Sequence, residues 1–293
     1  MSFQIHRSIN EIPAELSVAY YQKGYFNTQS YTQFISFSAD DLFIAFDMVD
    51  GMAISIPRSP FGSFVYRKGE VDLSSFFNEM LLVLKEEGAR SIHIHHPSEI
   101  YSDFISSSDL LAPGVHESYV DITQHVALDQ DIQLHTMQKR KLEGLQRDGF
   151  EFRKMESEEY ETAHKFLTVC RESQGLQINI SWDHLSQLID QLPNTYECFG
   201  VFREERISAV CFTVNVTKDV AYYFLPGTGP LFRSHSPMVL LMTGMMDYYK
   251  AKGYRCFDLG ISSIQGKPQE TLRIFKERMG AVETPKPTFE LTL

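Results

Sequence analysis

The sequence has no long apolar run, no paired cysteines and no excess of positive charge. A membrane-spanning helix needs about 20 consecutive apolar residues, and no segment approaches that length, so we expect no membrane span. The first eleven residues have no apolar core and no signal-peptide shape, which favours a cytoplasmic protein. The formal net charge of −11 disfavours broad nucleic-acid binding, because such binding depends on neutralising phosphates.

The four cysteines are far apart, and no two form a C-x-x-C pair: Cys170, Cys198, Cys211 and Cys256. This spacing argues against a zinc site and against a disulfide framework. Most of them lie in apolar runs, so we expect small core residues. His93 and His95 share one face of a predicted strand, but no acidic or cysteine partner stands at a diagnostic spacing, so we expect no metal.

The chain does have enough apolar material for large packed cores, with 293 residues of which 43% are hydrophobic. Its length favours two domains. Two distant segments repeat one pattern: a predicted helix at 76–84 or 238–249, a closing glycine, an arginine and a strand. Antiparallel strands and a loop rich in glycine and proline precede each helix. We therefore predict an α/β (α+β) protein with two similar domains, 1–130 and 131–293, each a mixed, mostly antiparallel sheet flanked by helices.

The last fifty residues carry the pattern with the most chemical content. A predicted strand over 254–260 contains Asp258 and stops on a glycine, and a predicted helix over 268–279 brings Arg273 and Lys276 back towards it. Ligands of open α/β sheets bind outside the carboxyl ends of strands. The pattern therefore indicates either a site for an anionic or charge-developing substrate, or a well-capped helix with a solvated basic face.

The order of hairpin, third strand, loop, helix, strand and helix resembles the GNAT superfamily of acyltransferases. The segment Asp258-Leu-Gly260, followed by Phe275-Lys276 in a helix closed by Gly280, resembles the Fem-type transferases and their tandem-GNAT relatives. The loop Pro57-Arg-Ser-Pro-Phe-Gly62 is similar to the proline-rich loop in the first half of such proteins. The resemblance implies transfer of an acyl or aminoacyl group from a thioester or ester donor to a small-molecule or peptide-like amine.

The resemblance also implies two catalytic residues, Lys276 and Asp258. Lys276 would stabilise the negative charge that forms as the donor carbonyl becomes tetrahedral. The alternative is an ion pair on a wet surface, which stabilises little. Asp258 would orient the amine or Lys276, or would pair with Arg255 or Arg273.

An acyl-CoA donor would place its pyrophosphate at the N-terminus of the helix that we expect to begin at Ser236-Pro237, where backbone N–H groups favour an anion. The predicted donor-binding residues surround this point: Leu225, Gly227, Thr228, Gly229, Arg233, Ser236 and Arg273. We expect Arg58 and Phe61 to contact the acceptor. The usual Arg/Gln-x-x-Gly-x-Gly/Ala loop is missing, which favours Fem-like donors or an altered pocket.

Three functions follow from this interpretation. The leading one is transfer of an acyl group from an acyl-CoA-type donor to an amine, without a metal. The second is aminoacyl transfer from charged tRNA, which the missing loop favours and the acidic net charge opposes. The third is a catalytically degenerate GNAT fold that serves as a binding module.

Overall fold

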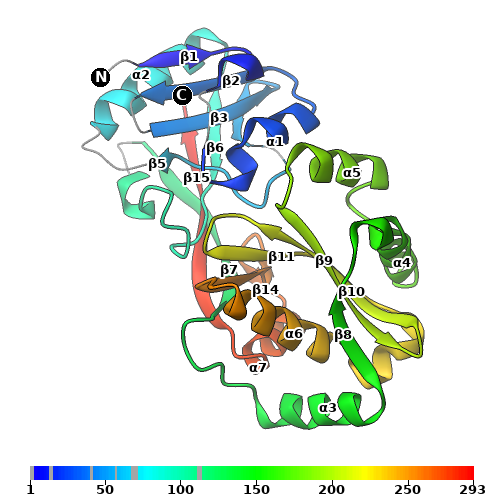
Figure 1. Cartoon of the computed structure of the whole chain (residues 1–293). Helices are drawn as coiled ribbons and strands as arrows, with labels where there is room; N and C mark the ends of the chain where they lie inside the picture. Colours follow the sequence, from blue (N-terminus) through cyan, green and yellow to red (C-terminus); the bar gives the residue numbers. More distant parts are fainter. Residues whose placement is uncertain (1–2, 13–15, 40–41, 57, 67–71, 111–113) are drawn as a thin grey trace. The chain divides into compact units, whose positions relative to one another are not determined.

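The computed structural model describes residues 3–12, 16–39, 42–56, 58–66, 72–110 and 114–293, and the chain divides into two compact units. Unit 1 contains residues 1–123, 263–268 and 284–293, and unit 2 contains residues 124–262 and 269–283. The predicted mixed α/β class, with mostly antiparallel strands flanked by helices, is confirmed (Figure 1). Within the described residues, no helix is both long and apolar enough to cross a membrane. The boundary expected near residue 130 stays a prediction.

Unit 1 contains a sheet whose strands follow the order β1-β2-β3-β4-β6-β15, with β5 paired to β3. The strands are β1 (Gln4–His6), β2 (Phe34–Ala39), β3 (Leu42–Val49), β4 (Met52–Ser55), β5 (Val65–Tyr66), β6 (Ser91–His95) and the end of β15 (Val282–Thr292). Its helices and 3₁₀ turns are η1 (Ile9–Glu11), η2 (Ala19–Tyr21), α1 (Lys23–Thr28), α2 (Leu73–Glu86) and η3 (Ser107–Leu110). The small hairpin β13 (Ser263–Ile264) and β14 (Lys267–Pro268) also belongs to this unit. Its core is rich in phenylalanine from β2, β3 and α2.

Unit 2 contains a sheet in the order β7-β12-β11-β10-β9-β8. The strands are the end of β7 (His116–Ala127), β8 (Phe150–Lys154), β9 (Tyr196–Arg203), β10 (Arg206–Asn215), β11 (Val220–Thr228) and β12 (Cys256–Ile261). The helices and 3₁₀ turns are α3 (Thr136–Arg147), η4 (Ser157–Glu159), α4 (Tyr160–Glu172), α5 (Trp182–Gln191), η5 (Pro230–His235), α6 (Met238–Ala251) and α7 (Glu270–Arg278). The helices α4 and α6 pack on this sheet (Figure 1).

Helix α6 is buried almost all round, as its apolar sequence predicts. It packs on one face of the sheet with residues from β9 to β12, among them Cys211 and Phe257. On β10, the neighbouring residue Phe212 instead contacts Tyr160 of α4, with ring centroids 5.4 Å apart. The two helices therefore cover opposite faces of the sheet, because successive side chains of a strand alternate between faces. All four cysteines are buried, as expected, and none of the four forms a disulfide.

Candidate active site

The strands β11 and β12 separate at the point where the sequence predicts a site. They pair in parallel at Val220 with Cys256, Ala221 with Phe257 and Tyr222 with Asp258. Throughout 216–283, all of which the structure describes, this pairing goes no further, although β11 continues to Thr228. On its other edge, β11 shifts register against β10 after Tyr223, which leaves Phe224 as an extra residue. Such bulges bend a strand and re-aim its backbone groups.

Lys276 is buried beside the end of β12, where its side chain is anchored by the backbone. The residue is 3% exposed, and Nζ donates to the carbonyl oxygens of Gly260 and Ile261, each at 2.8 Å. An ammonium group has three N–H donors, so one N–H remains beyond these two bonds. The alternative of an ion pair on a wet surface is therefore wrong for this residue.

Burial lowers the pKa of Lys276 to about 8, and the nearby negative charge of Asp258 opposes that shift. Desolvation disfavours the charged form of a lysine, whereas a carboxylate close by favours it. With a pKa of about 8, most Lys276 side chains carry a proton at pH 7. The site thus holds a cation in a largely dry place, where its field is stronger than in water.

Asp258 and Gly260 form a tight unit at the end of β12. The Oδ1 atom of Asp258 accepts the backbone N–H of Gly260 at 2.8 Å, and the carboxylate is buried. Gly260 has φ +72°, and a Cβ atom at this position would lie 3.1 Å from the hydroxyl oxygen of Tyr222. A glycine is required here both by the backbone conformation and by the approach of the tyrosine. The strand β12 ends at Ile261, one residue beyond the predicted end at Gly260.

A buried polar clamp, which the sequence analysis missed, fixes the start of α7. The hydroxyl of Ser262 donates to Oε1 of Gln124 at 2.6 Å, and Nε2 of Gln124 donates to the carbonyl of Arg273 at 3.1 Å. The backbone N–H of Gln269 donates to the carbonyl of Ser262 at 2.8 Å. Both Gln124 and Ser262 are fully buried. Because Lys276 lies one turn after Arg273, this clamp also positions the ammonium group.

Arg273, predicted to bind the donor, has its charge neutralised by neighbouring acids. Its guanidinium contacts Glu283 through Nε and lies 3.1 Å from Glu270 through Nη1. Arg255, the other arginine considered as a partner of Asp258, donates to Asp219 at 3.0 Å. Both cations thus have carboxylate partners of their own.

The glycines predicted to cradle the donor lie close to α4. A Cβ atom at Gly227 would lie 2.5 Å from a methyl carbon of Leu167, and one at Gly229 would lie 3.1 Å from Phe166. Arg233 donates to the hydroxyl of Ser173, just after α4, at 2.6 Å. The close approach of α4 is therefore enough to explain why both positions need glycine.

Ser236 does not cap α6 as expected, and this is a correction. Helix α6 has Pro237 as its N-cap, and no side chain caps it. Ser236 instead ends the preceding 3₁₀ turn with φ +58°, donating its N–H to the carbonyl of Arg233. Ser236 thus belongs to the end of the 3₁₀ turn and not to the start of α6. Of the remaining predicted donor residues, Leu225 is buried and Thr228 half-buried at the end of β11.

The two predicted acceptor residues lie in unit 1 and differ from each other. Phe61 is 2% exposed and packs among Tyr20, Tyr101 and Phe104, with the Tyr101 ring centroid 4.6 Å away. Phe61 is thus part of the aromatic core of unit 1, and its contact with the acceptor stays a prediction. Arg58 is exposed, with φ +62°. Pro57, the start of the proline-rich loop, lies outside the described residues.

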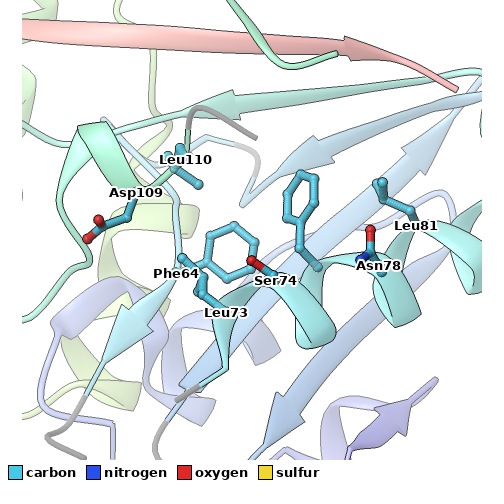
Figure 2. A pocket seen from close by; sticks show the side chains of 8 residues that line it. Phe64, Leu73, Ser74, Asn78, Leu81, Asp109 and Leu110 are labelled. Carbon is cyan, nitrogen blue, oxygen red and sulfur yellow. The ribbon is translucent and has the colours of Figure 1, made fainter. Parts of the chain in front are cut away.

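Unit 1 also contains a cavity of about 320 Å³ beside α2, formed mostly by apolar side chains (Figure 2). Its lining residues are Phe64, Leu73, Ser74, Phe77, Asn78, Leu81, Asp109 and Leu110. None of them is cationic, and none belongs to the predicted site. Among these lining residues, the groups that could donate to an oxyanion are the hydroxyl of Ser74 and the amide of Asn78, both neutral.

Comparison with known proteins finds a similar domain, most of it within unit 2 of this chain. Residues 134–267 match the family model described as Acetyltransferase (GNAT) domain. No curated protein matches the chain in sequence. Residues 134–267 are therefore similar to a GNAT domain, as the sequence pattern predicts.

Several solved structures are similar to this chain in fold. FemX has a TM-score of 0.68 at 14% identity, over 100% of this chain and 98% of that one. The C-terminal domain of a putative lysylphosphatidylglycerol synthetase from Agrobacterium fabrum has a TM-score of 0.63 at 16% identity, over 86% of this chain and 80% of that one. A tandem GNAT protein from the clavulanic acid biosynthesis pathway has a TM-score of 0.55 at 8% identity, over 99% and 98% of the two chains. In fold, the chain therefore resembles FemX and a tandem GNAT protein over almost its whole length.

Proposed function

We propose that this protein is an N-acyltransferase that moves an acyl group from an acyl-CoA-type donor to an amine acceptor in unit 2. The observation that carries the proposal is the buried ammonium of Lys276, bonded at 2.8 Å to the carbonyls of Gly260 and Ile261 where β12 has left β11. A cation held in place without water suits a reaction that develops negative charge on an oxygen. The match of residues 134–267 to a GNAT domain supports the same reaction class.

The chemistry assigned to each residue follows from its position. The donor carbonyl lies beside the separated end of β11, near Leu225 to Thr228, and Lys276 stabilises its oxygen when the amine attacks. Asp258 keeps Lys276 protonated through its nearby charge, and it accepts the Gly260 N–H, which fixes the strand end. The clamp of Gln124 and Ser262 holds α7 so that the ammonium does not have to reorganise during the reaction.

Aminoacyl transfer from charged tRNA is the second candidate, and one observation favours it. Gly227 and Gly229 lie against Leu167 and Phe166 of α4. This close packing of the glycines against α4 differs from a glycine loop whose backbone N–H groups bind a pyrophosphate. Binding of charged tRNA that weakens steeply with salt would support this donor, whereas weak binding that does not depend on salt would exclude it.

Calorimetric titration with acetyl-CoA, combined with a thiol-release assay, tests the leading proposal. We expect saturable binding and release of thiol in the presence of a peptide amine. Lys276→Met should reduce kcat by roughly 100- to 1,000-fold, the usual loss for one oxyanion donor, while acetyl-CoA binding changes little. Lys250→Met is the matched control, because Lys250 also donates to a backbone carbonyl, that of Gln130, but is exposed.

Three outcomes would contradict the proposal. Absence of acetyl-CoA binding at high micromolar concentration would exclude this donor. Binding without any turnover in the wild type, unchanged in Lys276→Met, would identify a catalytically degenerate binding module. An equal loss of turnover in Lys250→Met would show that the effect is not specific to the buried ammonium.

A further inference from the structure

The apolar face of helix α2 in unit 1 is wider than the part that is fully buried. The fully buried row consists of Phe76, Met80 and Leu84, each at most 1% exposed. A second row, made of Leu73, Phe77 and Leu81, also repeats every four residues, so its side chains lie together on one face of the helix. Both of its leucines are only half-buried. Apolar surface therefore continues from the core along α2 to a place that the protein covers incompletely.

The second row of α2, Leu73, Phe77 and Leu81, lines the cavity of about 320 Å³ (Figure 2). Phe64, just before β5, and Leu110, at the end of η3, complete the apolar lining. Phe64 is fully buried, and the centroid of its ring lies 6.2 Å from that of Phe77. Packed protein interiors have few holes larger than a water molecule, whereas ligand pockets are mostly apolar and span about 300–1,000 Å³. The cavity therefore has the size and the lining of a small ligand site.

The remaining lining residues are polar and exposed, namely Ser74 and Asn78 on α2 and Asp109 on η3. Within the part of the chain that the structure describes, none of these three side chains has a hydrogen-bond or ion-pair partner. Ser74 and Asn78 are four residues apart and are therefore neighbours on the helix surface. The hydroxyl and the amide can each donate and accept a hydrogen bond. An apolar interior with a few polar groups at its edge is the usual arrangement of a small-molecule site.

The charges near the cavity favour an uncharged ligand. Of the lining residues, only Asp109 carries a charge at pH 7, and that charge is negative. The N-terminus of α2 would attract an anion, but the carboxylate of Asp72 already accepts the N–H of Ser75 there, at 3.0 Å. An anion would thus lose hydration without gaining a cationic partner. A cation would gain little, because ion pairs with an exposed carboxylate such as that of Asp109 are weak.

We propose that this cavity binds a small uncharged molecule that has an apolar part of about ten carbon atoms and one polar group. An apolar cavity of about 150 Å³ holds one benzene ring, and the cavity beside α2 is about twice as large. The apolar part of the ligand lies against Phe64, Phe77 and Leu110, and its polar group lies at Ser74 and Asn78. The site belongs to unit 1 alone and is independent of the acyl transfer proposed for unit 2.

The first test is a titration of the whole protein with 1-octanol, followed by NMR of the leucine methyl groups. The methyl signals of Leu73, Leu81 and Leu110 should shift together and saturate, whereas those of Leu145 in the core of unit 2 should not move. From butanol to octanol, each added CH₂ group should tighten binding about threefold to fourfold. The gain should end at about ten carbons, where the chain fills the cavity. Shifts that do not saturate, or a gain that continues to dodecanol, would overturn the site.

The second test measures whether the cavity discriminates by charge. Octanoate is as long as octanol but is anionic at pH 7, so it should bind roughly tenfold more weakly. In Asp109→Asn this difference should shrink roughly threefold, because the negative charge of the lining is lost. Octanoate that binds as well as octanol would overturn the assignment of an uncharged ligand. A difference that Asp109→Asn leaves unchanged would contradict the argument from charge.

Two neighbouring substitutions on α2 test whether octanol occupies the cavity. Asn78 lines the cavity and Glu79 does not, and both are exposed, so a larger side chain at either position leaves the core intact. Asn78→Trp should weaken octanol binding roughly tenfold or more, because the indole takes the space of the ligand, while Glu79→Trp should bind like the wild type. Urea denaturation checks that both variants are folded.

Equal binding of octanol by Asn78→Trp and Glu79→Trp would place the alcohol outside the cavity and overturn the proposal. None of these measurements depends on acetyl transfer. They therefore remain decisive for the cavity of unit 1 even if the function proposed for unit 2 fails.

Discussion

The two units contain the same strand arrangement and use it differently. In unit 1, β4 and β6 pair in parallel from Met52 with Ser91 to Ile54 with His93. In unit 2, β11 and β12 pair in parallel over the same number of residues, ending at Tyr222 with Asp258. His95 and Gly260 therefore occupy matching positions, each two residues past the last pair.

In unit 1 the chain itself fills the place beyond this pairing. The N–H of Gly62 donates to the carbonyl of His95 at 2.7 Å, and the hydroxyl of Ser55 donates to the carbonyl of Gly62 at 2.8 Å and accepts the N–H of His95 at 3.1 Å. Next to it, the hydroxyl of Ser63 lies 2.8 Å from Nδ1 of His96, and the Ser63 N–H donates to the hydroxyl of Tyr21. The backbone groups there are satisfied by the protein.

In unit 2 the matching carbonyls, those of Gly260 and Ile261, bind a lysine ammonium. The comparison shows that the place where two parallel strands separate can be filled by a loop of the chain, as in unit 1, or can hold a buried charge, as in unit 2. A closed arrangement serves stability. A buried charge is costly for stability unless it is paired and hydrogen-bonded, so a protein that keeps one usually needs it for a function. The two ends should therefore respond differently to pH and to substitution.

The largest expected difference is the cost of Lys276 to stability at neutral pH. Its pKa falls from 10.5 to about 8 on folding, so between these values the unfolded chain binds more protons than the folded one, and stability rises with pH. Relative to Lys276→Met, the wild type should gain roughly 2–3 kcal/mol in free energy of unfolding between pH 7 and 10, at about 1.4 kcal/mol per pKa unit. Urea denaturation of both proteins at each pH measures this. A constant difference would mean that the ammonium is not desolvated.

The corresponding prediction for unit 1 has the same direction in pH but lies in a more acidic range. Burial lowers the pKa of His96 from 6.5 to about 4, so the neutral imidazole contributes stability that is lost as pH falls below 6.5. Relative to His96→Gln, the wild type should lose roughly 2 kcal/mol between pH 7 and 5. The same urea series, extended to acid, measures it. Parallel curves for the two proteins would show that the imidazole near Ser63 titrates normally.

The sequence was sufficient to place Lys276 and Asp258 near each other, because the evidence is local. The strand, the glycine that ends it and the following helix are contiguous, and α7 begins two residues after the start of the predicted helix. By contrast, Gln124 of the polar clamp comes from β7, more than a hundred residues earlier in the chain. No local pattern marks it, since the neighbourhood of β7 and β12 depends on the completed sheet.

The glycine-rich loop shows why the donor residues were harder to interpret. Glycines in Pro226-Gly-Thr-Gly-Pro230 are compatible with a phosphate cradle and also with a strand on which a helix packs closely. The structure shows close packing, with Leu167 and Phe166 at the glycine positions. A sequence specifies that a side chain must be absent at these positions, but not which neighbour requires its absence.

The smallest expected effect compares two glycines with the same backbone conformation in the two units. Gly260 and Gly88 have φ +72° and +90°, so alanine is strained at both by roughly 1–2 kcal/mol. A Cβ atom at Gly88 would meet no atom within 4 Å, whereas one at Gly260 would lie 3.1 Å from the hydroxyl of Tyr222. Gly260→Ala should therefore destabilise the protein more than Gly88→Ala. Adding Tyr222→Phe to Gly260→Ala should restore the part of the stability that is lost beyond the loss in Gly88→Ala, but not the part lost to backbone strain. If Gly260→Ala and Gly88→Ala lose the same free energy of unfolding, the hydroxyl of Tyr222 does not crowd Gly260.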